Sequence, residues 1–157
     1  SCLFTLRDEA LSMGLGKSAQ VVSEHAQLLE EFLAKEQKAG RFTPRFKESA
    51  QPILVHGHCH QKAFDAVSPA LELLRLIPNA NPQLIESSCC GMAGSFGYEV
   101  EHIEASKQMA ELSLLPTIRN HPDALVVADG TSCRHQIADG ASREAMHIAK
   151  VLEKCLI

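Results

Sequence analysis

Residues 124–133 read Ala-Leu-Val-Val-Ala-Asp-Gly-Thr-Ser-Cys, a short apolar run followed at once by a turn that carries a cysteine. The run does not alternate with polar residues, which is typical of a strand buried on both faces in a parallel sheet. Two other segments repeat this arrangement, because apolar residues 52–55 precede Cys59 and residues 83–87 precede Cys89-Cys90. Open α/β sheets bind their ligands at the carboxyl ends of the strands. We therefore expect the three cysteine-bearing turns to share one edge of a sheet.

Helical periodicity fills the sequence between these strands. The apolar spacing predicts helices, which cover residues 5–13, 18–38, 61–67, 68–77, 98–120 and 142–156. The helix over 98–120 is expected to kink or restart at Pro116, which has no N–H to donate. The last helix carries Ala145 on its apolar stripe. Strands that alternate with helices predict an α/β fold, here a three-layer Rossmann-like parallel sheet with flanking helices.

The composition excludes several classes of protein. The chain has 157 residues, of which 45% are hydrophobic, so it is long enough for one ordinary core. Its net charge of -4 gives no basic surface for nucleic acid, and we expect no nucleic-acid partner. No apolar run approaches the roughly 18 residues that a membrane-spanning helix needs. The chain starts at Ser1 rather than at a methionine, and we expect it to be an excised piece of a longer intracellular protein.

The cysteines follow the pattern C-x29-C-C-x42-C, which runs from Cys59 through Cys89 and Cys90 to Cys133. Zinc fingers need close pairs such as C-x2-C, so this spacing is not theirs. Disulfide-stapled secreted domains are usually smaller than this chain. Four thiolates from three loops suit an iron-sulfur cluster or a tetrahedral zinc ion, since both favour sulfur ligands. The adjacent pair favours the cluster, because neighbouring side chains on an extended segment point apart.

Glycines follow the cysteine pair at every third position, at Gly91, Gly94 and Gly97. Glycine lets the backbone approach a bound group closely, and exposed amides there can donate hydrogen bonds to cluster sulfurs. These three glycines are therefore predicted to wrap a cofactor. The alternative is a loop that holds an anion at the N-terminus of the following helix.

Histidines surround the candidate ligands. His56, His58 and His60 alternate, so on an extended strand they would share one face with Cys59 on the other, which argues against one metal bound by all four. His60 and His135 each lie within two residues of a candidate ligand, and we assign them a role as ligands or as hydrogen-bonding neighbours of the metal. A hydrogen-bonded structural histidine is the alternative for both.

A thiol nucleophile is the other chemical option. Cys59 lies between His58 and His60, and Lys62 and Arg134 could lower the pKa of a thiol at these turns. Partners in a catalytic pair are usually distant in the chain, so this option is less favoured.

The three cysteine motifs resemble a known family. His-Cys-His-Gln-Lys-Ala at 58–63, Cys-Cys-Gly-Met-Ala-Gly-Ser-Phe-Gly-Tyr-Glu at 89–99 and Ala-Asp-Gly-Thr-Ser-Cys-Arg-His-Gln-Ile at 128–137 resemble the cysteine-rich CCG domain. That domain occurs in the iron-sulfur subunit of glycolate oxidase and in a subunit of heterodisulfide reductase. The chain is most similar to the C-terminal part of FAD plus iron-sulfur proteins that oxidise D-lactate or D-2-hydroxyglutarate.

The resemblance implies a division of the chain. Such proteins carry two copies of the domain, so residues 1–48 would be the mostly helical tail of a preceding copy, whose last cysteine would be Cys2. Residues 49–157 would form the second CCG domain. An FAD-binding domain or subunit would lie elsewhere, together with the preceding copy. The location implied is cytoplasmic, with a peripheral position at the inner membrane as an option.

The resemblance also implies a function. Cys59, Cys89, Cys90 and Cys133 would ligate an iron-sulfur cluster, in an oxidoreductase domain that is not active alone. The cluster would relay electrons from FAD to an acceptor, either a quinone or an electron carrier, after oxidation of a 2-hydroxy acid. Gln136 stands where the fullest family pattern has its last cysteine, so a 4Fe-4S cluster is implied rather than the noncubane type. A structural zinc module is the alternative.

Overall fold

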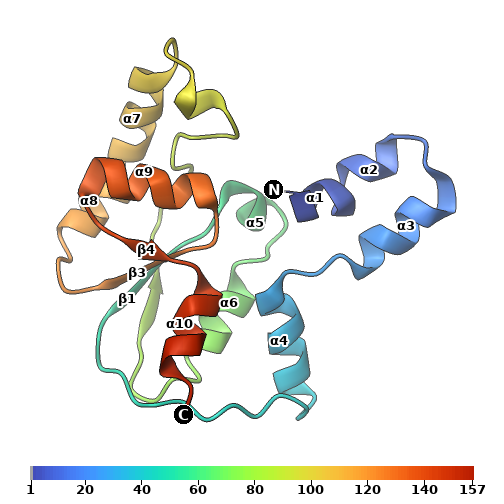
Figure 1. The fold of residues 1–157 in the computed structure, drawn as a ribbon, viewed down its shortest axis with the longest axis horizontal. Helices are drawn as coiled ribbons and strands as arrows, with labels where there is room; N and C mark the ends of the chain where they lie inside the picture. Colours follow the sequence, from blue (N-terminus) through green and yellow to red (C-terminus); the bar gives the residue numbers. More distant parts are fainter. Residues whose placement is uncertain (1) are drawn as a thin grey trace.

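A computed structural model describes residues 2–157, apart from the side chain of Cys2. Four parallel strands form one sheet in the order β2-β1-β3-β4, and Figure 1 labels β1, β3 and β4. The strands are β1 (Ile53–His56), β2 (Pro82–Leu84), β3 (Leu125–Ala128) and β4 (Ala145–Met146). Ile53 in β1 lies between Pro82 of β2 and Leu125 of β3. The sheet and its flanking helices confirm the predicted α/β fold.

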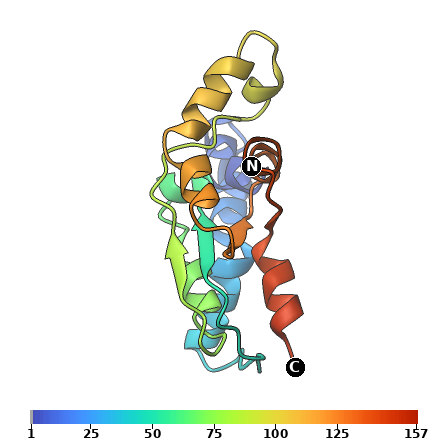
Figure 2. The ribbon, with the colours of Figure 1, turned by 90° about the vertical axis from the view of Figure 1, so that its left-hand side faces the viewer.

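Helices connect the strands and extend to both ends of the chain. Besides the short 3-10 turn η1 (Phe96–Tyr98), the helices are α1 (Cys2–Arg7), α2 (Glu9–Ser12), α3 (Gly16–His25), α4 (Leu29–Lys38), α5 (Cys59–Ala63), α6 (Ser68–Leu74), α7 (Ile103–Glu111), α8 (Leu114–Arg119), α9 (Thr131–Ala141) and α10 (Ile148–Cys155). In two views at right angles, α7 lies at the opposite end of the molecule from the C-terminus (Figures 1 and 2).

The two central strands explain the layers. Every residue of β1 is buried, and successive side chains of a strand point to opposite faces of the sheet. Ile53 and Val55 therefore pack with α4, α6 and α10 in one core cluster. Leu54 packs on the other side with residues of α8 and α9, in a second cluster that also contains Cys90 and Cys133. The predicted three layers follow from this alternation.

The expectation of one helix over residues 18–38 is wrong. The backbone leaves the helical conformation at Ala26 and Leu28, which separates α3 from α4. Arg7 explains the break, since its guanidinium donates to the carbonyl oxygen of Ala26 at 2.5 and 3.0 Å and to the Glu31 carboxylate at 2.6 Å. Glu31 in turn accepts a hydrogen bond from the backbone N–H of Leu28 at 2.7 Å, which stabilises the start of α4.

The expectation of one helix over residues 142–156 is also wrong. Helix α9 fills much of the cysteine-bearing turn after β3 and ends at Ala141, and the next residue, Ser142, has a left-handed φ of 52°. Ala145, which the helical spacing places on an apolar stripe, belongs instead to the short edge strand β4. A small apolar side chain at this position is compatible with a helix or a strand. Pairing with Val126 of β3 at the edge of the sheet makes the segment a strand.

The interruption in residues 98–120 lies before Pro116 rather than at it. Helix α7 ends at Glu111 and α8 begins at Leu114, which places Pro116 in the first turn of α8. A proline there costs no helical hydrogen bond, because the first N–H groups of a helix have no partner within it.

The N-terminal helices contribute to the core. Ala34 of α4 and Phe46 pack in the same cluster as Ile53, while α1 to α3 extend sideways from the sheet (Figure 1). The division into residues 1–48 and 49–157 stays a prediction, and the role assigned to the Cys2 thiol lies outside the described side chains. Among residues 2–157, no helix has the length and apolar character needed to cross a membrane.

Candidate metal centre

The four predicted cysteine ligands follow three neighbouring strands. Cys59 begins α5 just after β1, and Cys89 and Cys90 come after β2. Cys133 lies in the first turn of α9, after β3. Cys90 and Cys133 are buried, Cys59 and Cys89 are partly exposed, and all four are free thiols. The four cysteines therefore meet at the carboxyl edge of the parallel sheet, as the strand pattern predicts, while metal binding by them stays a prediction.

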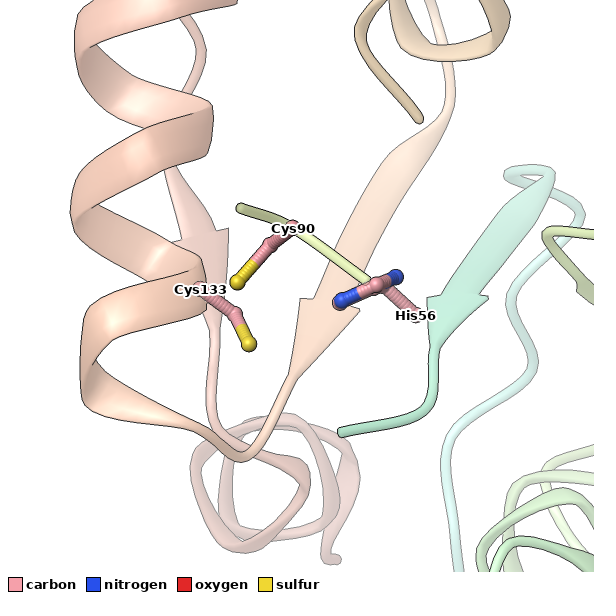
Figure 3. A group of neighbouring side chains, drawn as sticks. All are labelled: His56, Cys90 and Cys133. Carbon is pink, nitrogen blue, oxygen red and sulfur yellow. The ribbon is translucent and has the colours of Figure 1, made fainter. Parts of the chain in front are cut away.

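A histidine joins the two buried cysteines. One ring nitrogen of His56 and the Sγ atoms of Cys90 and Cys133 lie within 4.8 Å of one another. Figure 3 shows a ring nitrogen of His56 pointing toward the two sulfur atoms. His56 is the last residue of β1 and is 2% exposed. We call these three residues the His-Cys-Cys cluster.

The sequence interpretation missed His56 for a geometric reason. It treated His56, His58 and His60 as alternating residues on one extended strand. Strand β1 ends at His56, however, and the Nδ1 atom of His58 accepts a hydrogen bond from the backbone N–H of His60, which caps α5. The three imidazoles therefore do not share a face. The signal that could have found His56 is its place as the last buried residue of a strand.

Hydrogen bonding leaves one nitrogen of His56 unused. Its Nδ1 atom lies 2.9 Å from the hydroxyl oxygen of Ser87. Its Nε2 atom is the one buried side-chain nitrogen or oxygen without a hydrogen-bond partner in the described part of the chain. A buried polar atom without a partner is costly, so such atoms are rare in proteins and usually face an ion or a functional group. Two soft thiols and an imidazole nitrogen fit a transition metal.

The two buried thiols shift each other's pKa in opposite directions. A hydrogen bond from the Cys133 thiol lowers the pKa of Cys90, and His56 acts in the same direction against the effect of burial. The same hydrogen bond raises the pKa of Cys133, as do burial and the charges of Cys90, Cys59 and Cys89. The pair therefore favours one thiolate and one thiol, and the deprotonation of all four sulfurs needs a compensating cation.

A lysine supplies part of that positive charge. The ammonium of Lys62 donates to the carbonyl oxygens of Ser87 and Ser88, the second at 3.1 Å, just before the cysteine pair. Burial lowers the pKa of Lys62, whereas the charges of the four cysteines raise it. Burial raises the pKa of the Cys89 thiol, and the backbone N–H of Gly91, which donates to its Sγ atom at 3.2 Å, opposes that effect.

The predicted glycines have different roles. Gly91 has φ 89°, and a Cβ atom there would lie 2.1 Å from the carbonyl oxygen of Ser106 in α7. A Cβ atom at Gly97 would meet the Met92 sulfur at 2.4 Å, whereas Gly94 has open space. Gly91 and Gly97 thus permit close packing of the loop on itself and on α7, and only the Gly91 amide reaches a candidate ligand.

Gly130 is the glycine that packs against the candidate centre. A Cβ atom at this position would lie 2.7 Å from the His58 ring and 2.8 Å from the Sγ atom of Cys133. Gly130 follows a predicted strand and precedes a candidate ligand, and that place in the sequence is the signal that could have identified it.

The other predicted histidines lie outside the His-Cys-Cys cluster. His60 is exposed, with its ring 5.8 Å from Phe4 and 5.3 Å from His58 between centroids. His135 is also exposed, and its Nδ1 atom lies 2.7 Å from the hydroxyl of Tyr98. Neither His60 nor His135 belongs to the group of donors around the buried thiols, so the roles predicted for them near a metal stay predictions.

Gln136 occupies the place of the additional family cysteine without facing the thiols. Its amide is buried and donates to the carbonyl and hydroxyl oxygens of Ser106, both at 3.1 Å. The Gln136 side chain thus joins α9 to α7 by hydrogen bonds. It offers no sulfur ligand at this position.

A network of polar side chains connects α4 with the turns that carry Cys59 and Cys133. The Nε2 atom of Gln61 donates to Glu30 at 2.8 Å and to Asp129 at 2.9 Å, and its oxygen accepts from the backbone N–H of His58 at 2.8 Å. Asp129 also accepts from the first backbone N–H of α10, at Ile148. Burial, followed by the charge of Asp129, raises the pKa of Glu30 to about 7. This network connects α4 with the turns after β1 and β3.

Comparison with known proteins relates the chain to dehydrogenases. It is 29% identical to a subunit of the anaerobic glycerol-3-phosphate dehydrogenase of Escherichia coli (strain K12) over 156 residues, which are 99% of this chain and 39% of the relative. It is 33% identical over 82 residues to the D-2-hydroxyglutarate dehydrogenase of Haemophilus influenzae, covering 51% of this chain and 8% of the relative. The match to the enzyme of the same name from Pantoea ananatis is 40% over 53 residues, which are 34% of this chain and 5% of that enzyme.

These relatives are oxidoreductases or subunits of them, and the chain is homologous to parts of them. The chain spans 39% of the length of the relative that it matches over nearly all of its own sequence. No protein-family model matches the chain. No solved structure matches it.

Proposed function

We propose that this chain is the iron-sulfur electron-transfer part of a larger flavin-dependent dehydrogenase. The observation that carries the proposal is the meeting of four free cysteines at one edge of the sheet, two of them buried beside an unpaired imidazole nitrogen. The names of the relatives support an oxidoreductase. A 4Fe-4S cluster bound there would accept and pass on one electron at a time.

The residues of the chain would hold and tune this group. Cys59, Cys89, Cys90 and Cys133 would supply thiolate ligands, whose softness suits iron. The Gly91 amide, which already donates to Cys89, would reduce the negative charge on one sulfur. The ammonium of Lys62 is anchored next to the cysteine pair and would offset the charge of the thiolates. Burial of Cys90 and Cys133 keeps water from that side of the centre.

Substrate oxidation would take place outside this chain. We propose a 2-hydroxy acid of the glycolate, D-lactate or D-2-hydroxyglutarate type as the substrate, with glycerol 3-phosphate as the alternative suggested by the name of one relative. The partners would be an FAD-binding domain or subunit, a preceding copy of the cysteine-rich domain and an acceptor, which is a quinone or an electron carrier. The proposed location is cytoplasmic or at the inner face of the inner membrane.

Anaerobic reconstitution of the purified chain with iron and sulfide tests the proposal. We expect bound iron and sulfide with broad visible absorption, and Cys90→Ser should remove most of both. Cys155→Ser is the matched control, because Cys155 packs against the other core cluster, at the end of α10, and should leave iron content unchanged. Equal iron in the wild type and in Cys59→Ser, Cys90→Ser and Cys133→Ser would rule the proposal out.

A structural zinc module is the second candidate, because the donor atoms of the His-Cys-Cys cluster lie close enough for a single ion. Zinc would hold three turns together without absorbing visible light or changing redox state. Zinc bound at one equivalent with a raised unfolding temperature, together with no iron uptake under reducing anaerobic conditions, would favour this candidate over the cluster.

A further inference from the structure

The unpaired nitrogen of His56 is the starting observation. The imidazole is 2% exposed, and its Nε2 atom has no hydrogen-bond partner. The same ring points toward the Sγ atoms of Cys90 and Cys133 (Figure 3). A buried nitrogen without a partner costs folding free energy, and that cost is recovered where the lone pair binds an ion.

We propose that His56 is a direct metal ligand through Nε2, so that the centre has a mixed nitrogen and sulfur donor set. The proposal rests on the proposed function only for the identity of the metal. Donor atoms around a tetrahedral zinc ion lie about 3.5 to 3.8 Å apart, as follows from bond lengths of about 2.0 to 2.3 Å. The three donors of the His-Cys-Cys cluster, which lie within 4.8 Å of one another, need only small side-chain movements to reach this arrangement.

Ser87 holds the imidazole in the required orientation. Its hydroxyl oxygen lies 2.9 Å from Nδ1, and the tautomer with the proton on Nδ1 donates to that oxygen and leaves the Nε2 lone pair free. A hydrogen bond from the second ring nitrogen is a general feature of metal-binding histidines, because it fixes the ring and the tautomer. Lys62 also contacts Ser87, through its carbonyl oxygen and, at 3.4 Å, its hydroxyl, so the hydroxyl is itself held in place.

The other histidines near the turns are engaged elsewhere. The Nδ1 atom of His58 caps α5 by accepting from the N–H of His60 at 3.2 Å. His60 and His135 are exposed, with contacts to Phe4 and Tyr98 respectively. Among these imidazoles, the geometry therefore selects His56. Together with Cys90 and Cys133 it fills three of four ligand positions, so that one of the two partly exposed cysteines, Cys59 or Cys89, would supply the fourth.

A consequence for the redox behaviour follows from charge. A neutral imidazole in place of a thiolate removes one negative charge from the centre, and such a replacement raises the reduction potential of iron-sulfur centres. The proposal therefore predicts that His56→Cys, which restores an all-sulfur donor set, keeps the metal and lowers its potential. A hydrogen bond from His56 to Cys90, which would also contribute to the lowered pKa of Cys90, is the competing arrangement. It predicts no nitrogen bonded to the metal.

Pulsed electron paramagnetic resonance on the reduced, reconstituted wild-type chain tests the bond directly. Samples with natural and 15N-labelled histidine should show a strong nitrogen hyperfine coupling that changes with the label. The coupling should be lost in His56→Cys and kept in the exposed control His135→Asn. Wild-type spectra without a directly bonded nitrogen, or a coupling that survives in His56→Cys, would overturn the proposal, and the wild-type measurement needs no variant to fold.

Cobalt(II) separates this inference from the proposed function. The metal-free chain is titrated with Co²⁺, whose absorption bands report sulfur and nitrogen ligands. We expect the wild type to bind with a mixed spectrum and His56→Cys to bind with stronger sulfur charge-transfer bands. If iron and sulfide fail to assemble while cobalt gives this result, the electron-transfer proposal fails and the role of His56 stands. Identical cobalt spectra in the two proteins would overturn the role of His56, whatever the result with iron.

Discussion

Replacement of Glu30 by glutamine should make the stability of the chain less dependent on pH. Glu30 is 2% exposed, and burial and the nearby Asp129 raise its pKa from the ordinary 4.5 to about 7. Below pH 4.5 the carboxyl is protonated whether the chain is folded or not. Between these two pKa values the folded chain holds a proton that the unfolded chain has lost, so stability falls as the pH rises. Above pH 7 this loss is complete.

The size of the effect follows from the two pKa values. Ionised Glu30 should cost about 3 kcal/mol of folding free energy above pH 7, of which about 2.5 kcal/mol appears between about pH 5 and about pH 8. Glu30→Gln keeps an oxygen that can accept from Gln61 and carries no charge at any pH. The stability of the variant relative to the wild type should therefore rise by about 2.5 kcal/mol between about pH 5 and about pH 8.

Urea denaturation of the metal-free chain, followed by circular dichroism at both pH values, measures this difference. Glu31→Gln is the matched control on the same helix. Burial raises the pKa of Glu31, but hydrogen bonds from Arg7 and from the N–H of Leu28 lower it more. Its stabilisation is lost only as the pH falls below about 4.5, so the control should lose equal stability at both pH values. An unchanged or falling stability of Glu30→Gln relative to the wild type would refute the reasoning.

Three further predictions concern other contacts. Gly91→Ala should destabilise the chain by about 3 kcal/mol or more, since φ is positive and the new Cβ meets a backbone oxygen of α7. Gly94→Ala, where the new Cβ has open space, should cost about 1 kcal/mol. Equal urea midpoints for the two variants would contradict this difference. Arg7→Ala should lower the free energy of unfolding by about 2 kcal/mol, because the contacts of Arg7 with Ala26 and Glu31 are lost. Amide hydrogen exchange in α1 to α3 should become faster. Unchanged exchange there would argue against the contact. Gly130→Ala should weaken zinc or cobalt binding by roughly tenfold or more while circular dichroism stays unchanged, because the added Cβ displaces the sulfur of Cys133. An unaltered affinity would contradict this prediction.

The wrong expectation of one helix over residues 18–38 results from a contact between distant residues. The break between α3 and α4 depends on Arg7, which lies 19 residues from the Ala26 carbonyl that it binds. Nothing in the local periodicity of residues 18–38 reveals that contact. Glu30, on which the sequence analysis makes no prediction, also has a distant partner, because Gln61 lies 31 residues away, in α5.

The amino-acid sequence by itself determined the parallel sheet and the edge at which the cysteines gather. Buried strands leave continuous apolar runs such as residues 124–128, and parallel topology brings the turns after such runs to one edge. Only the tertiary structure decided which donors meet there. The chain leaves the strand after His56, so this imidazole reaches Cys90 and Cys133, whereas His60 and His135 face solvent. Side-chain direction at the end of a strand depends on where the strand stops and on what packs against it, and both are properties of the folded chain.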